Sequence, residues 1–403
     1  MEAPVVSDVA PIKDCTGCGA CALSCPVDAI TLDSEPDGFA HAVIDDDTCI
    51  GCGLCHHICP ALNPLPLREP QSVYAAQSQS HDTLMHSASG GAFYEIARAF
   101  QQQGGIVYGA EMTIDHSNAT ISHAVATDEQ GLHKLQGSKY AQGSAHPVFH
   151  EIQHRLDEGE RVLFSGLPCQ VAGLQAYLDQ TYDSLITVDI FCHGNTSPYY
   201  LNVYLDYLKK KHGQDIADYI FRDKERGNGY KPIAILADGT RVRMTTFEES
   251  YWYLFATSKF YRDSCYRCPY ASPRRVSDIS IGDFWGIEKE RPDLLAGNGG
   301  PLDDVFGISA VLANTPAGDA LIRQTDLVLE SSSMAEVTPG GAAVRAPQER
   351  PADRDKVLEL FRTGDYAAVK KYCVKQQGRW YYLDLLSDSA VVKAVKKLSG
   401  KVR

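Results

Sequence analysis

Cysteine is the residue whose spacing points most directly to chemistry in this chain. The sequence has thirteen cysteines, and eight of them lie between residues 15 and 59. They form two copies of one pattern, C-x2-C-x2-C-x3-C-P, the second 34 residues after the first. This doubled run is typical of two-cluster ferredoxins, in which the fourth cysteine of each run binds the other cluster. The predicted ligands are Cys15, Cys18, Cys21 and Cys59 for the first [4Fe-4S] cluster and Cys49, Cys52, Cys55 and Cys25 for the second.

The residues around these cysteines also suit a cluster-binding turn. Two structural zinc sites are the alternative, but zinc sites pair two C-x2-C halves and do not produce this doubled run. We therefore predict an electron-carrying module over residues 1–62 with an α+β ferredoxin-like fold. Glycines that permit a left-handed backbone close to the sulfurs stand at Gly17, Gly19, Gly51 and Gly53.

The composition excludes several other classes of protein. The chain has 403 residues, 44% of them hydrophobic, so a folded core is expected and wholesale disorder is not. The formal net charge is −13, which argues against nucleic acid as a partner. No apolar run approaches the roughly 20 residues that cross a bilayer, and the first residues do not resemble a secretory signal. We therefore expect a cytoplasmic protein.

The elements downstream must position the remaining cysteines. A proline-rich linker over residues 63–72 separates the module from residues 73–345, where predicted strands and helices alternate. That alternation is typical of an α/β domain, here predicted with a mixed sheet. Residues 346–403 are predicted to form a helical, basic tail. We favour a solvated terminal helix there over contact with a membrane surface or an acidic partner.

Four cysteines lie in this second domain. Cys169 follows a predicted strand over residues 161–165, and Cys192 follows another over 185–191. A right-handed crossover brings the carboxyl ends of such strands to the same edge of a sheet, where ligands gather in α/β domains. Cys265 and Cys268 form a separate C-x2-C pair. The spacing alone leaves two interpretations open: a third [4Fe-4S] cluster, or two buried cysteines and a redox pair.

Four short motifs stand in the second domain: Gly166-Leu-Pro-Cys169-Gln170, Phe191-Cys192-His193-Gly194, Cys265-x2-Cys268-Pro269 and Asp278-Ile-Ser-Ile-Gly-Asp283-Phe-Trp285-Gly286. Together they resemble the coenzyme F420 hydrogenase/dehydrogenase beta-subunit family, with a ferredoxin module placed in front. The resemblance covers roughly residues 1–350, and residues 89–91 and 137–140 also match it. It implies an iron–sulfur flavoprotein that holds FAD beside a cluster, and it implies Cys169, Cys192, Cys265 and Cys268 as the ligands of that third cluster.

Two loops are the candidates for binding the flavin. The first opens a predicted helix, so its backbone N–H groups and the positive helix end suit a pyrophosphate. The second combines small residues with a cation suited to phosphate or to the pyrimidine edge of a reduced flavin. A G-x-G-x-x-G fingerprint is not apparent, which disfavours a Rossmann-type NAD site. The candidate residues are Ser89, Gly90 and Gly91 in the first loop and Gly137, Ser138 and Lys139 in the second.

The leading functional hypothesis is an oxidoreductase that couples two-electron hydride chemistry at FAD to one-electron transfer through [4Fe-4S] clusters. The hydride would be exchanged with coenzyme F420 or an organic substrate, and the electrons with a ferredoxin-type partner. The alternative is a non-catalytic electron-transfer subunit of a larger redox complex. No residue stands out as a general acid, and the substrate and the direction of electron flow stay open.

Overall fold

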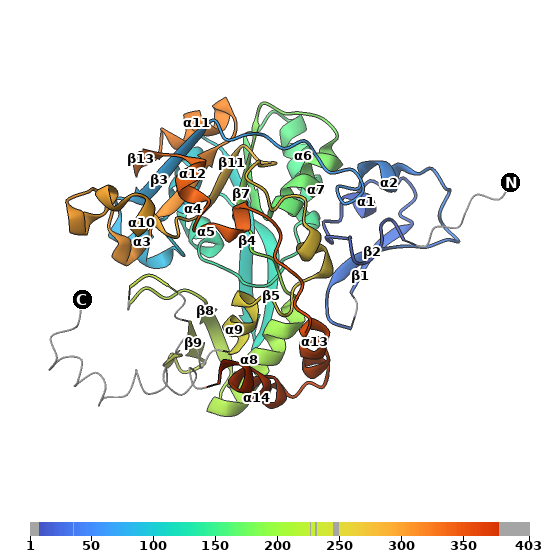
Figure 1. The fold of residues 1–403 in the computed structure, drawn as a ribbon. Helices are drawn as coiled ribbons and strands as arrows, with labels where there is room; N and C mark the ends of the chain where they lie inside the picture. Colours follow the sequence, from blue (N-terminus) through green and yellow to red (C-terminus); the bar gives the residue numbers. More distant parts are fainter. Residues whose placement is uncertain (1–7, 35, 226, 230–231, 245–249, 379–403) are drawn as a thin grey trace.

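A computed structural model describes residues 8–34, 36–225, 227–229, 232–244 and 250–378. Figure 1 shows a large central sheet with helices on both faces, and the N-terminal module beside α6 and α7. No helix among the described residues is long and apolar enough to cross a membrane.

The N-terminal module consists of one β-hairpin and two short helices. β1 (Ile30–Ser34) pairs antiparallel with β2 (Ala40–Ile44). α1 (Ala20–Leu23) and α2 (Leu54–Ile58) carry the third cysteine of each run. Each helix begins after a glycine with positive φ, which lets the backbone turn tightly beside the sulfurs. The predicted α+β arrangement is what the structure has.

The main sheet has eight strands in the order β13-β3-β12-β11-β7-β6-β4-β5. The central strands β4, β6, β7 and β11 run parallel, and the remaining neighbours are antiparallel. This is the mixed sheet that the sequence predicts. The strands are β3 (Ser72–Ser78), β4 (Ile106–Asp115), β5 (Asn118–Ala126), β6 (Val162–Gly166), β7 (Leu185–Ile190), β11 (Ile279–Asp283), β12 (Ser309–Ala313) and β13 (Leu327–Ser332).

Helices cover both faces of this sheet because its strands alternate between two apolar cores. Val107 and Leu163 pack in one core with α4 and α5, whereas Tyr108 and Phe164 pack in the other with α6 and α7. The helices of this domain are α3 (His81–His86), α4 (Ala92–Gln102), α5 (Glu129–Leu135), α6 (Phe149–Asp157), α7 (Pro168–Leu178), α10 (Ile287–Glu290), α11 (Pro316–Ile322) and α12 (Met334–Val337).

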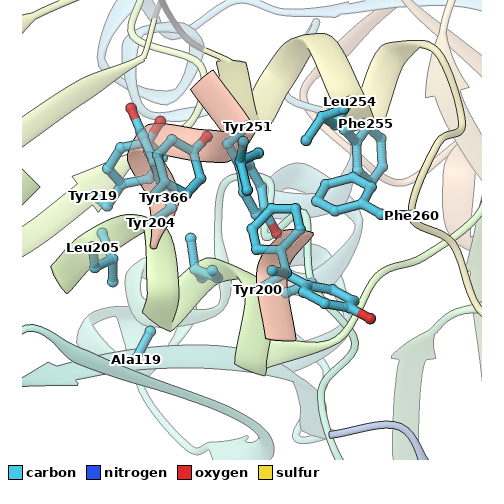
Figure 2. Packing of buried hydrophobic residues seen from close by; sticks show 14 of the residues in the cluster. Ala119, Tyr200, Tyr204, Leu205, Tyr219, Tyr251, Leu254, Phe255, Phe260 and Tyr366 are labelled. Atoms are coloured by element: carbon cyan, nitrogen blue, oxygen red, sulfur yellow. The ribbon is translucent and has the colours of Figure 1, made fainter. Parts of the chain in front are cut away.

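A third, aromatic core joins four further helices to a small sheet. Tyr200, Tyr204, Tyr251 and Tyr366 pack against one another there (Figure 2). Residues 354–377, which the sequence assigns to a separate tail, belong to this core, and the rest of the tail, with its predicted surface contact, lies outside the described residues. The elements are α8 (Pro198–His212), α9 (Ser250–Ala256), α13 (Arg354–Arg362), α14 (Tyr366–Gln377), β8 (Ile216–Ile220), β9 (Ile233–Leu236) and β10 (Arg241–Arg243).

Candidate cofactor site

The four cysteines of the second domain come together around one small cavity of about 40 Å³. Cys169 lies in the first turn of α7, Cys192 follows β7, and Cys265 and Cys268 stand in and just after a 3-10 helix, Asp263–Arg267. Burial raises the pKa of Cys169 well above its usual value, and the charges of the other three thiolates raise it further. All four are free thiols. A donor set of four convergent thiols fits a [4Fe-4S] cluster.

The local structure explains how α7 presents Cys169. The helix begins at Pro168, because proline suits the first helical position. Cys169 therefore lies at the positive end of the helix dipole, which favours a thiolate. Cys265 receives a backbone N–H from Asn195 at 3.4 Å.

A buried ion pair stands next to this cysteine set. Arg275 and Asp189 are 1% and 0% exposed, and a guanidinium nitrogen of Arg275 lies 2.7 Å from a carboxylate oxygen of Asp189. The charge of Arg275 lowers the pKa of Cys192 and of Cys268, although burial outweighs it in both. Arg275 thus adds positive charge at a site that concentrates thiolates.

The first ferredoxin run forms a second set of cysteines. The pKa of Cys18 is raised to about 11, mainly by burial and in part by the charges of Cys15 and Cys59. The pKa of Cys21 is raised by burial and then by the charges of the same three cysteines. Cys59, the last cysteine of the second run, therefore lies with the first run, as the crosswise pattern predicts.

The second run lies at the surface. Cys49 and Cys52 are exposed. Burial raises the pKa of Cys55, and the charges of Cys52 and Cys49 add to this effect. Cys25, their predicted fourth partner, packs with Cys55 against the module's core and receives a backbone N–H from Ala29 at 3.2 Å. No three His, Cys, Asp or Glu side chains are arranged to hold a single metal ion in the part of the chain that the structure describes.

Helix α7 connects the two inner cysteine sets. A Cβ atom added at Gly173 would lie 2.7 Å from the Cβ of Cys18 and 3.2 Å from its sulfur. Gly173 is one helical turn after Cys169, so about 6 Å of helix separates a thiol of one set from the backbone that contacts the other. The charge of Cys18 also raises the pKa of Cys169. The structure therefore places the first ferredoxin run beside the third cysteine set.

A larger cavity of about 530 Å³ adjoins the third set. Both candidate flavin loops reach it, through Ser89 and Gly91 at the start of α4 and through residues 137–139. Gly90 does not line the cavity. Its missing side chain instead lets the loop lie on the sheet, because a Cβ there would stand 2.4 Å from the carbonyl oxygen of Ala76. The volume lies within the roughly 300–1,000 Å³ typical of cofactor pockets.

Lys139 is held by the protein rather than pointing freely at a ligand. Its ammonium donates to the carbonyl oxygens of Leu135 and Gln136, both at 2.8 Å, at the end of α5. Burial lowers the pKa of Lys139 to about 7, although Glu111 and Asp218 act in the opposite direction. A lysine that lines the cavity with this pKa changes charge near neutral pH.

The cavity also contains residues that the sequence analysis did not single out. His123 on β5 is 6% exposed, and its Nε2 donates to the carbonyl oxygen of Ser165 at 3.0 Å. Its Nδ1 is buried with no hydrogen-bond partner, and burial lowers its pKa to about 4. Arg222 is buried and forms a bidentate ion pair with Asp283, at 2.6 and 3.0 Å. Neither residue belongs to a motif, so no sequence signal marked them.

Aromatic side chains complete the walls. Tyr140, Trp252 and Phe255 contact one another, with ring centroids 4.6–5.5 Å apart. Trp285, from the last of the four motifs, lines the cavity, and the guanidinium of Arg222 lies 5.5 Å from the centre of its ring. Apolar aromatic walls with a few polar groups suit the flat, largely apolar ring system of a flavin.

The turn after β7 separates the two cavities. Residues 192–195 line both the small cavity between the cysteines and the larger one. Nδ1 of His193 lies 2.7 Å from the hydroxyl of Tyr261, and burial lowers the pKa of this histidine. A cofactor in the larger cavity would therefore be separated from the cysteine set by a single turn of chain.

Comparisons with known proteins agree with this geometry. Residues 14–63 match the family model of a 4Fe-4S dicluster domain. The chain is thus an iron–sulfur protein of the electron-transfer class. Residues 159–336 match the family model of the carboxyl-terminal part of the coenzyme F420 hydrogenase/dehydrogenase beta subunit. The chain thus joins a dicluster domain to a domain that matches part of an oxidoreductase beta subunit.

One solved structure similar to the chain is that of the F420-reducing [NiFe] hydrogenase complex from Methanosarcina barkeri, in a xenon derivative. The match has 18% sequence identity and a TM-score of 0.45, and it covers 78% of this chain and 94% of that one. None of the curated proteins compared with the chain matches it.

Proposed function

We propose that this protein exchanges two-electron hydride equivalents for single electrons, with FAD in the 530 Å³ cavity and three [4Fe-4S] clusters in series. The proposed ligand sets are the two crosswise sets of the ferredoxin module and the set of Cys169, Cys192, Cys265 and Cys268. The chemistry that bound FAD supplies is the conversion between hydride and single-electron transfer, which clusters alone do not perform.

The observation that carries this proposal is the wall shared by the two cavities. Cys192 and His193 line the cysteine cavity on one side and the larger cavity on the other. Beyond the cysteines, α7 leads from Cys169 to the contact between Gly173 and Cys18. One continuous path of packed residues therefore supports transfer from the larger cavity to the ferredoxin module.

The chain's own residues would bind FAD, orient its ring system and shield it from water. The backbone at Gly91 begins α4, an eleven-residue helix whose positive end suits a pyrophosphate. Tyr140, Trp252 and Phe255 provide apolar surface for the ring system. Because the Nε2–H of His123 donates to the carbonyl oxygen of Ser165, its Nδ1 is a hydrogen-bond acceptor. This nitrogen therefore suits an N–H group of the ligand.

The substrate of the hydride step is proposed to be coenzyme F420 or an organic molecule that enters the same cavity. The alternative function is a non-catalytic electron-transfer subunit of a larger complex. The exposure of Cys49 and Cys52 favours docking on another protein, and it is compatible with both functions.

The experiment compares Cys265→Ala with Cys373→Ala in anaerobically purified protein. Cys265 belongs to the proposed third cluster, whereas Cys373 is fully buried in the aromatic core and serves as the matched control. The wild type and the control are expected to contain FAD and to transfer electrons from a hydride donor to a viologen dye. Cys265→Ala should retain FAD but lose this transfer, together with about four irons per chain. A wild-type protein with clusters but no flavin would refute the proposal and support the carrier function.

A further inference from the structure

The two halves of the ferredoxin module have opposite surroundings although their sequences repeat. In the first half, the loop around Cys18 is covered by the second domain. A Cβ at Gly17 would lie 3.0 Å from the side chain of Arg262, and one at Gly19 would lie 2.4 Å from the side chain of His146, and both neighbours belong to the second domain. This half faces inward.

The equivalent loop of the second half is open. A Cβ added at Gly51 or Gly53 would meet no atom within 4 Å. Ile50 is 65% exposed and Leu54 is 39% exposed, so two large apolar side chains lie at the surface beside this ligand loop. Figure 1 shows α2 on the side of the module away from the main sheet.

The sequence around this loop is acidic. Residues 14–67 contain eight Asp and Glu and no Lys or Arg. Asp45, Asp46 and Asp47 lie two to four residues before Cys49 and are exposed. Asp45 shapes the loop, since it accepts from the hydroxyl of Thr48 at 2.6 Å and from the backbone N–H of Asp47 at 3.1 Å. Asp46 and Asp47 are therefore the carboxylates that can be changed without altering this turn.

We propose that the surface formed by Asp46, Asp47, Ile50 and Leu54 is the docking site for a small one-electron carrier protein whose cofactor edge is ringed by Lys and Arg. This inference rests on the proposed relay, and it names the end of the relay at which a partner binds. An apolar centre beside the cysteines with an acidic rim complements an apolar cofactor edge with a basic rim. An acidic ferredoxin would be repelled by the same carboxylates.

The test measures binding between the oxidised protein and a basic c-type cytochrome in the ferric state, so that no electron transfer is needed. The variant is Asp46→Lys/Asp47→Lys. The matched control is Glu288→Lys/Glu290→Lys on α10, which makes the same change in net charge at exposed positions on the opposite side of the molecule (Figure 1). The docking variant should raise Kd about tenfold or more at low salt, and the control less than about twofold.

A further variant, Ile50→Ser, should weaken binding without altering its salt dependence, because it removes apolar contact and no charge. Equal weakening by the two charge-reversal variants would refute the docking site, because it would reflect overall charge alone. An acidic ferredoxin that binds more tightly than the cytochrome and loses affinity in Ile50→Ser would refute the proposed basic partner. The proposed function is tested separately, by measuring the flavin content. A protein that lacks flavin but still binds the cytochrome at this surface would refute the relay and leave the docking site in place.

Discussion

Substituting Gly173 by alanine tests the contact between α7 and the ferredoxin module. The new Cβ would lie 2.7 Å from the Cβ of Cys18, about 1 Å closer than the ordinary carbon–carbon contact of about 3.5–4.0 Å. Both atoms belong to short, backbone-fixed groups, so the helix and the module must separate. Such overpacking costs about 1–3 kcal/mol.

Helix propensity alone predicts that Gly173→Ala stabilises the protein. Gly173 lies inside α7, and replacing an interior glycine by alanine normally stabilises a helix by up to about 1 kcal/mol. If the clash dominates, Gly173→Ala should lower the free energy of unfolding by up to about 2 kcal/mol, the overpacking cost less the gain in propensity. It should also widen the gap that electrons cross between the first and third cysteine sets.

The assay is thermal unfolding of the anaerobic protein, followed by bleaching of its visible absorbance, together with single-turnover reduction through the ferredoxin module. Gly297→Ala is the control, because a Cβ there meets no atom within 4 Å and the backbone φ is ordinary. An unchanged or raised midpoint temperature in Gly173→Ala would refute the close contact on which the path between the cysteine sets depends.

Three other predictions concern buried polar groups. Arg362→Ala should lower the free energy of unfolding by about 1–3 kcal/mol in a denaturant titration, because it leaves the buried carboxylate of Asp37 without its bidentate partner at 2.6 and 2.7 Å. Arg275→Leu should cost about 3–5 kcal/mol in the same measurement, because Asp189 would stay buried and unpaired, whereas the double variant with Asp189→Leu should recover much of that loss. The pKa of His123 is about 4 in the folded protein, compared with an ordinary value of 6.5. As the pH falls from 6.5 to 4, the imidazole therefore binds a proton only in the unfolded chain, and this lowers the free energy of unfolding. Between pH 7 and pH 4.5, the free energy of unfolding of His123→Gln should therefore fall by about 2–3 kcal/mol less than that of the wild type. An equal decrease in both proteins would contradict the buried neutral imidazole.

The cysteine chemistry could be predicted from the sequence because its information is local. Ligand spacing and adjacent glycines define a ferredoxin run within a few residues, and the crosswise position of Cys59 follows from the doubled pattern. The meeting of Cys169 and Cys192 follows from consecutive parallel strands, and the pairing of β6 with β7 confirms that arrangement. The pair formed by Cys265 and Cys268 needed the family resemblance, because about 70 residues separate it from Cys192.

What the sequence could not predict depends on contacts between distant segments. In the sequence, Lys139 resembles a free cation that could bind phosphate. In the structure, its ammonium donates to carbonyl oxygens at the end of α5, and the sequence does not show this contact. His123 is one position in an alternating strand, and only the packing of β5 brings it to the cavity. The assignment of residues 354–377 to a tail failed for the same reason, because their apolar face is matched by side chains of α8 and α9.

The most direct test of the central claim is the quantity of iron, sulfide and flavin per chain in protein purified without oxygen. We expect about twelve irons, about twelve sulfides and one FAD per chain. Eight irons would remove the cluster at Cys169, Cys192, Cys265 and Cys268. Bound zinc in place of iron, or clusters without flavin, would contradict the conversion of hydride equivalents into single electrons.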